Sequence, residues 1–177
     1  MPDVFQVLKQ DHDEVKAMLG RLEDGRKATD AATAEQLGER QQLVEDVIIA
    51  ESRHEAVEQQ YFWPAVRELG PDGARVADEG LDQEAEGERV LHALGKLSSD
   101  DLRFEDLLTS FTSAARAHIA YEEAHAWPLL RASISADRAA ELGDTIIQAK
   151  KLAPTAGPMA GVADRLRDAV TGRGRKG

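Results

Sequence analysis

The stretch His54-Glu55-Ala56-Val57-Glu58, followed by Trp63-Pro64 and Arg67, decides how this chain folds. It recurs 64 residues later as His118-Ile119-Ala120-Tyr121-Glu122, followed by Trp127-Pro128 and Arg131. In each copy a histidine and a glutamate are four residues apart, and this spacing stacks both side chains on one face of a helix. Two such helices packed face to face would bring two imidazoles and two carboxylates together. That arrangement is typical of a metal site.

The residues around the two copies have the periodicity of long amphipathic helices. Helices are predicted at about residues 4–24, 34–69, 74–97 and 102–133, and a shorter one at about 137–152. Asp3 is the expected N-cap of the first helix, and Pro64 is expected to bend or restart the second. Short connections between four long helices predict an all-α fold, an up-down antiparallel four-helix bundle. Residues 1–150 are expected to form this bundle, and residues 151–177 a tail that contains Pro and Gly and a short amphipathic basic segment.

The apolar seams of these helices carry six polar residues where aliphatic side chains are expected. They are His12, His54, Glu58, Glu84, His118 and Glu122. His125 also falls on the seam of the fourth long helix, but it lies about 10 Å along the axis from His118, too far to join the same cluster. His92 is expected on a flank or at the surface. Burying the six groups without partners would be costly, and a bound cation removes that cost. The alternative is a metal-free, stress-related bundle with polar core residues.

The donor atoms of this cluster indicate which metal it would hold. The chain has no cysteine, which excludes disulfides, thiol catalysis and thiolate zinc sites. Six nitrogen and oxygen ligands, with Glu58 and Glu122 placed centrally enough to bridge, favour two six-coordinate ions. His12 is expected to act with His54 and Glu58, and Glu84 with His118 and Glu122. Iron is the first choice and manganese the second.

Composition limits the partners and the compartment. The formal net charge of −11 argues against nucleic acid as the main partner. No apolar run approaches the roughly 20 residues of a membrane span, and the first residues lack the features of a secretory signal. A cytoplasmic protein is therefore expected.

The chain resembles the bacterial hemerythrin-like proteins of the HHE cation-binding family. The resemblance covers about residues 4–133 and is carried by Asp11-His12, His54-x3-Glu58-x5-Pro64 and His118-x3-Glu122-x5-Pro128. It implies a four-helix bundle that holds an oxo- or hydroxo-bridged non-haem di-iron centre. It also implies a small ligand, because family members bind oxygen, handle nitric oxide or peroxide, or sense iron and oxygen. Both a redox protein, with possible consumption of peroxide or nitric oxide, and an iron-dependent sensor or interaction protein remain open.

The sequence departs from the family pattern in the third helix. The histidine that the family has there falls at Glu84, and Glu86 and Glu88 are the alternative ligands. Glu55 matches a position that resembles an extra ligand in a relative that senses iron for protein degradation. The alternative for Glu55 is a solvated surface position.

Overall fold

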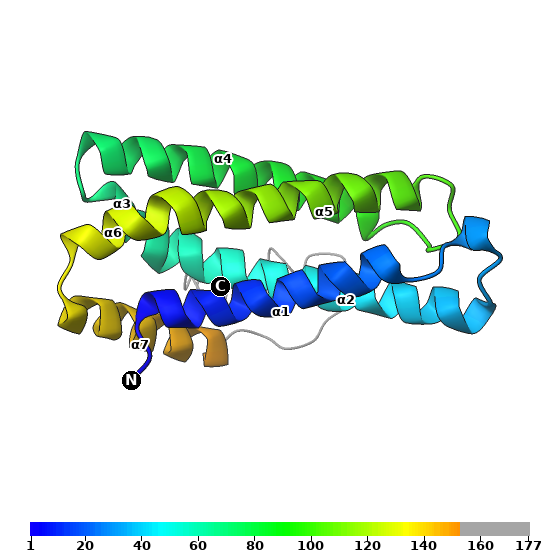
Figure 1. Ribbon diagram of the computed structural model, residues 1–177, viewed down its shortest axis with the longest axis horizontal. Helices are drawn as coiled ribbons and strands as arrows, with labels where there is room; N and C mark the ends of the chain where they lie inside the picture. Colours follow the sequence, from blue (N-terminus) through cyan, green and yellow to red (C-terminus); the bar gives the residue numbers. More distant parts are fainter. Residues whose placement is uncertain (153–177) are drawn as a thin grey trace, which may run out of the picture.

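The computed structural model describes residues 1–152, and these residues form helices and turns with no strand among them. This confirms the predicted all-α class. Four long helices lie side by side, and successive ones run in opposite directions (Figure 1). They are α1 (Val4–Asp24), α2 (Ala34–Val57), α4 (Pro71–Leu94) and α5 (Phe104–Tyr121), and a single 3-10 turn, η1 (Ala28–Asp30), lies between the first two.

The ends of the helices follow from local chemistry. Asp3 caps α1 as predicted: its carboxylate accepts a hydrogen bond from the Gln6 backbone N–H at 2.8 Å, and the Gln6 side chain accepts one from the Asp3 N–H. The connection expected between the helices at about 34–69 and 74–97 ends earlier in the structure. Gly70 has a φ of 98°, and α4 begins directly after it with Pro71, whose missing N–H costs nothing in a first helical turn.

Each helix that carries a His-x3-Glu pair is interrupted by one π-helical turn, which begins at the glutamate of the pair. These turns are η2 (Glu58–Phe62) and η3 (Glu122–Ala126), and the short helices α3 (Trp63–Arg67) and α6 (Trp127–Ser133) follow them. Pro64 and Pro128 sit in the first turns of α3 and α6, where a proline cannot donate to the carbonyl four residues earlier, and the wider turn accommodates that gap. The interruption expected at Pro64 therefore takes the form of a π turn, and the prediction of one continuous helix at about residues 102–133 is wrong.

The π turns also change which side chains face inward. A π turn holds one extra residue, so the inward position moves on by one. Phe62 and Ala126 are fully buried, whereas Tyr61 is only partly buried and His125 is exposed. The inward orientation predicted for His125 is wrong for this reason.

Two apolar clusters fill the bundle on either side of a polar layer. One is built around the beginning of α1, the residues after each π turn, and α7 (Ala136–Leu152); the other fills the opposite end around Leu19, Leu43 and Phe111. α7 packs so closely against the start of the chain that a Cβ at Gly143 would lie 2.6 Å from the Pro2 carbonyl oxygen. His12 lies between Leu8 of the first cluster and Val15 of the second, so the polar layer is enclosed by apolar packing.

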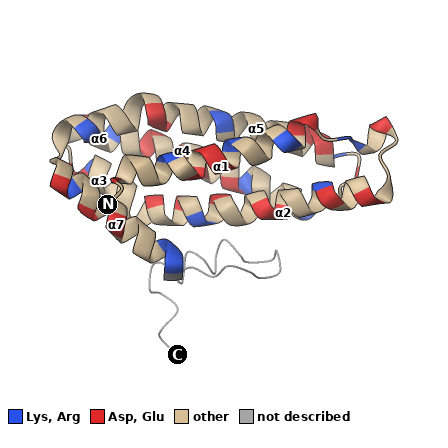
Figure 2. Cartoon of the chain, turned by 60° about the horizontal axis from the view of Figure 1, so that its bottom comes forward, with Lys and Arg blue, Asp and Glu red and all other residues tan. Residues whose placement is uncertain are grey.

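Charged side chains are spread along the long helices rather than gathered at one end (Figure 2). None of the helices within residues 1–152 has the length and apolar character that crossing a membrane requires. α7 continues to Leu152, and the predicted amphipathic basic segment of the tail lies outside the described residues.

Candidate metal centre

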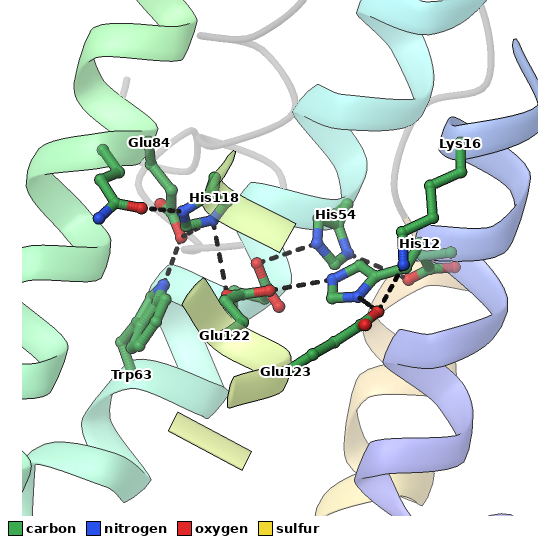
Figure 3. A network of polar contacts seen from close by, with 11 residues as sticks. His12, Lys16, His54, Trp63, Glu84, His118, Glu122 and Glu123 are labelled. Carbon is green, nitrogen blue, oxygen red and sulfur yellow. Dashed lines mark hydrogen bonds and ion pairs between the residues drawn. The ribbon is translucent and has the colours of Figure 1, made fainter. Parts of the chain in front are cut away.

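All six predicted side chains meet in the polar layer of the bundle (Figure 3). They come from four long helices and from the first residue of each π turn, and all are buried. They form two overlapping groups in which one ligand atom per residue lies within 4.8 Å of the others. The first, called here the His12 half-site, contains His12, His54, Glu58 and Glu122; the second, called the Glu84 half-site, contains Glu84, His118, Glu58 and Glu122. Glu58 and Glu122 thus belong to both half-sites.

The atoms that face the middle of this layer have no hydrogen-bond partner within residues 1–152. They are the Nε2 atoms of His12, His54 and His118 and all four carboxylate oxygens of Glu58 and Glu122. His12 Nε2 lies 2.9 Å from Glu122 Oε2, and His54 Nε2 lies 3.1 Å from Glu58 Oε2, without hydrogen-bond geometry. Buried polar atoms are rarely left without partners, because each costs on the order of 1–3 kcal/mol. Seven such atoms pointing at one another are the donor set that a cation would satisfy.

The other ring nitrogen of each histidine is held from outside this layer. The Nδ1 atoms lie 3.0 Å from Glu123 Oε1 for His12, 3.3 Å from Asp11 Oδ2 for His54 and 3.4 Å from Gln83 Oε1 for His118. A carboxylate or amide oxygen can only accept, so each contact favours the tautomer with hydrogen on Nδ1. The lone pair of each Nε2 atom then points into the polar layer. Metal-binding histidines are commonly oriented in this way.

Lysines neutralise the two carboxylates that hold histidines. Lys16 Nζ lies 2.7 Å from Glu123 Oε1, and Lys150 Nζ forms an ion pair with Asp11. Apart from Asp11, which belongs to the quoted motif, sequence reasoning missed these outer residues. The residues that contact the Nδ1 atoms could have been found from their positions in the sequence, because each directly precedes or follows one of the six predicted residues. The lysines carry no such signal.

Glu84 differs from the two shared glutamates because both of its oxygens have partners. Trp63 Nε1–H donates to Oε1, and the Gln59 side-chain amide donates to Oε2 at 2.7 Å. Each oxygen keeps a second lone pair, so these hydrogen bonds leave room for a metal bond. Of the alternative residues, Glu86 is exposed and paired with Arg89, and neither Glu86 nor Glu88 belongs to a half-site within the described residues.

The protonation of this layer follows from its burial. Burial raises the pKa of Glu84 to about 8 against the opposing hydrogen bonds from Gln59 and Trp63, and burial and the charge of Glu122 raise the pKa of Glu58 well above its usual range. Burial also acts on Glu122, but contact with His12 and the charge of His118 outweigh it and lower that pKa. Burial lowers the pKa of His118. Without a metal the layer therefore binds protons, and a cation would displace them.

Two further acids on α2 lie beside the six residues. Glu51 and Glu55 are buried, and burial raises the pKa of Glu51 to about 7 and that of Glu55 well above its usual value. A solvated surface position for Glu55 is therefore wrong. Neither residue belongs to the two groups of candidate ligands found among residues 1–152. His92 is exposed, as predicted.

Comparisons with known proteins agree with this geometry. The family model described as the hemerythrin HHE cation binding domain matches residues 3–130. A crystal structure of a hemerythrin HHE cation binding domain-containing protein from Mycobacterium kansasii has the same fold, with a TM-score of 0.69 and 19% identity over 85% of this chain and 86% of that one. No curated protein was found to match this chain. The buried histidines and glutamates, the fold and the family match together place this chain in the hemerythrin HHE cation-binding family.

Proposed function

We propose that this protein holds two iron ions in a non-haem di-iron centre and reacts with oxygen, peroxide or nitric oxide. The proposed ligands are His12, His54, Glu58, Glu84, His118 and Glu122, in an up-down four-helix bundle formed by residues 1–150. The observation that carries the proposal is the set of seven buried, unpartnered nitrogen and oxygen atoms that face one another. Two ions are proposed because the two candidate groups share only Glu58 and Glu122.

The donor set favours iron over other metals. It offers imidazole and carboxylate without sulfur, and two shared carboxylates in a helical bundle are typical of di-iron proteins. Manganese is the second choice, since carboxylates also suit it. When bound, iron would supply the electrons that oxygen, peroxide or nitric oxide chemistry requires. The chain itself would orient each imidazole through Nδ1 and keep bulk water out by apolar packing on both sides.

The charge of the Glu84 half-site favours consumption of the small ligand over storage of oxygen. A carboxylate in place of an imidazole adds negative charge in a low-dielectric layer, and negative charge stabilises the oxidised metal. A reversible oxygen carrier needs a ferrous site that resists oxidation. We therefore propose a resting ferric state and a protein suited to consuming peroxide or nitric oxide.

Elemental analysis and peroxide turnover of aerobically purified protein test this function together. The expected result is two iron ions per chain and peroxide loss that depends on the iron. Glu58→Ala should lose both the iron and the turnover, while His92→Ala, a change at an exposed position, should keep both. One zinc ion per chain, or no metal, would contradict the proposal.

The second candidate is an iron- or oxygen-responsive sensor or interaction protein whose bundle is stabilised by metal. One observation favours it: the Asp11 carboxylate that contacts His54 is also paired with Lys150 on α7, so the metal centre is linked to an outer helix. Two bound irons and a melting temperature that rises with metal, but without turnover of peroxide or nitric oxide, would favour this candidate. A cytoplasmic location and the absence of a nucleic-acid partner remain part of the proposal.

A further inference from the structure

The last turn of α7 is tied to α1 and to α2, the helix that carries His54. Lys150 Nζ forms an ion pair with Asp11 Oδ1 on α1, and the Lys150 carbonyl accepts a hydrogen bond from Arg53 Nη2 on α2 at 3.0 Å. The other oxygen of Asp11 lies 3.3 Å from His54 Nδ1. A continuous series of contacts therefore runs from Lys150 through Asp11 to His54. The lysine lies 20 residues beyond the end of the segment that matches the family model.

These contacts are shielded from solvent. The relative exposure of the side chain falls from 19% for Lys150 to 14% for Asp11 and 3% for His54. Ion pairs in such surroundings are screened less than those on an open surface. The Asp11 carboxylate thus uses one oxygen for the Lys150 ammonium and the other for the His54 ring nitrogen.

Among residues 1–152, the other half of the centre has no equivalent support. Gln83 takes the place of Asp11 and contacts His118 Nδ1 with a neutral amide oxygen. Its own amide donates at 3.0 Å to Glu79, an exposed residue of the same helix. His54 is thus held by a charged residue that a distant helix fixes, whereas His118 is held within the bundle alone.

We propose that Lys150 is a positioning residue of the metal centre, which acts through Asp11 to fix the ring of His54. In this view α7 is part of the metal site, and its docking sets how firmly the His12 half-site keeps its ion. The inference rests on the proposed function, since it requires His54 to be a ligand.

Removing the ammonium group would leave Asp11 without its counter-charge and free to turn away from the imidazole. Loss of a group that orients a metal-binding histidine typically costs about 10- to 100-fold in metal affinity. Lys150 acts one contact further out, so the lower end applies: Lys150→Met should release iron about tenfold faster. Lys150→Arg keeps the charge, so its rate of iron release should be close to that of the wild type.

The experiment follows the transfer of ferrous iron from the loaded full-length protein to an excess of chelator. Lys151→Met is the matched control, because Lys151 is exposed on the same turn and its loss changes the net charge equally. It should release iron at the wild-type rate. If wild-type protein takes up two ions and Lys150→Met releases them no faster, the inference fails and the proposed function stands. If the wild-type protein takes up none, both fail.

A double-mutant cycle separates positioning from general stability. Asp11→Asn should speed release by itself, and adding Lys150→Met to it should change the rate little, because the lysine acts through the carboxylate. If the increases in release rate from the two single changes multiplied in the double variant, Lys150 would act independently of Asp11, and the inference would be overturned.

Discussion

The two half-sites share the same pair of glutamates but are completed by different chemistry. In the His12 half-site an imidazole from α1 joins the group, and in the Glu84 half-site a carboxylate from α4 does so. Their surroundings correspond closely. The neighbour that precedes each of these residues, Asp11 or Gln83, contacts the histidine of the same half-site. α1 and α4 therefore correspond at an offset of 72 residues, as α2 and α5 do at 64.

This difference shows that the residue contacting His12 or Glu84 has the hydrogen-bonding character that each of them needs. His12 Nδ1 faces the Glu123 carboxylate, an acceptor, and this contact favours an N–H at Nδ1. The ionised Glu84 carboxylate offers only acceptor oxygens, and it faces the Gln59 amide, a donor, although Gln59 and Glu123 occupy equivalent positions. The change of histidine to glutamate is thus accompanied by a change of its partner. This matching supports Glu84 as a functional residue of the centre rather than a lost ligand.

The two tryptophans of the repeat, Trp63 and Trp127, make different contacts in the two half-sites. Trp127 stacks on the His12 ring, with centroids 5.0 Å apart and planes 11° apart. Trp63 instead packs against Gly80 and donates its indole N–H to Glu84. Where α4 has Gly80, α1 has the buried Leu8. The missing side chain lets the Trp63 ring move in far enough to reach the carboxylate.

The largest expected effect concerns the residues that the two halves share. Glu58→Ala or Glu122→Ala should each empty both half-sites, because each side chain belongs to both groups. Iron content by elemental analysis measures this. His125→Ala is the control, since that histidine is exposed. If either glutamate variant kept one full ion while His125→Ala lost iron, the shared role would be refuted.

A second test uses an acid that only one half of the repeat has. Glu51 is buried on α2 where α5 has the buried Ala115. Its pKa is raised from 4.5 to about 7 by burial, so the folded, metal-free protein binds this proton more tightly than the unfolded chain does. This tighter proton binding stabilises the folded protein. The stabilisation is fully present below about pH 4.5 and is lost as the pH rises through about 7. Because a pKa shift of one unit corresponds to about 1.4 kcal/mol, the unfolding free energy should fall by on the order of 3 kcal/mol at most.

Glu51→Gln should therefore flatten the pH dependence of the unfolding free energy of metal-free protein between pH 5 and 8. Urea unfolding at a series of pH values measures it. Glu39→Gln, a change at an exposed position of the same helix, should leave the slope as it is. If the slope for Glu51→Gln equalled that of the wild type, burial would not raise the pKa of Glu51.

A third test breaks the packing that distinguishes the tryptophans. A Cβ at Gly80 would lie 2.2 Å from the Trp63 ring, so Gly80→Ala must displace the indole and disrupt its hydrogen bond with Glu84. Overpacking of this kind costs about 1–3 kcal/mol. Gly87→Ala is the matched control on the same helix, because nothing lies within 4 Å of the added atom, and it should stabilise by up to about 1 kcal/mol. Equal unfolding free energies for both variants would contradict the close contact.

The smallest effect is expected from making the two halves alike. Glu84→His should raise the reduction potential, because it removes negative charge beside the metal, but it leaves the donors of Gln59 and Trp63 facing an imidazole. The mismatch should lower the iron content of Glu84→His. Adding Gln59→Glu copies the pairing of His12 with Glu123, so the double variant should regain iron, and its reduction potential should lie between those of the wild type and Glu84→His. A redox titration measures both. An unchanged potential in Glu84→His would remove Glu84 from the centre.

Sequence patterns located the helices and the six buried residues because both depend on local periodicity. The 64-residue repeat fixed the two His-x3-Glu pairs, and the seams of the other helices pointed to His12 and Glu84. What failed was the assumption of one period throughout each helix. A bend or restart was expected at Pro64 but not at Pro128, and a π turn was expected at neither. The one-residue shift that buries Phe62 and turns His125 outward was therefore missed.

Contacts between distant parts of the chain could not be predicted in the same way. The burial of Glu55 depends on how α2 and α4 pack, and the pairing of Lys150 with Asp11 joins residues far apart in sequence. Gly80 and Gly87 are alike as sequence signals, yet only Gly80 meets a side chain. Such features follow from the shapes of neighbouring helices, which periodicity does not describe.

The most direct test of two unlike ions in one centre is a Mössbauer spectrum of the full-length protein loaded with iron-57. Two nitrogen ligands in the His12 half-site and one in the Glu84 half-site should make the two ions distinguishable. We expect two iron ions per chain and two quadrupole doublets of equal area. A single doublet, or one iron ion per chain, would contradict this account.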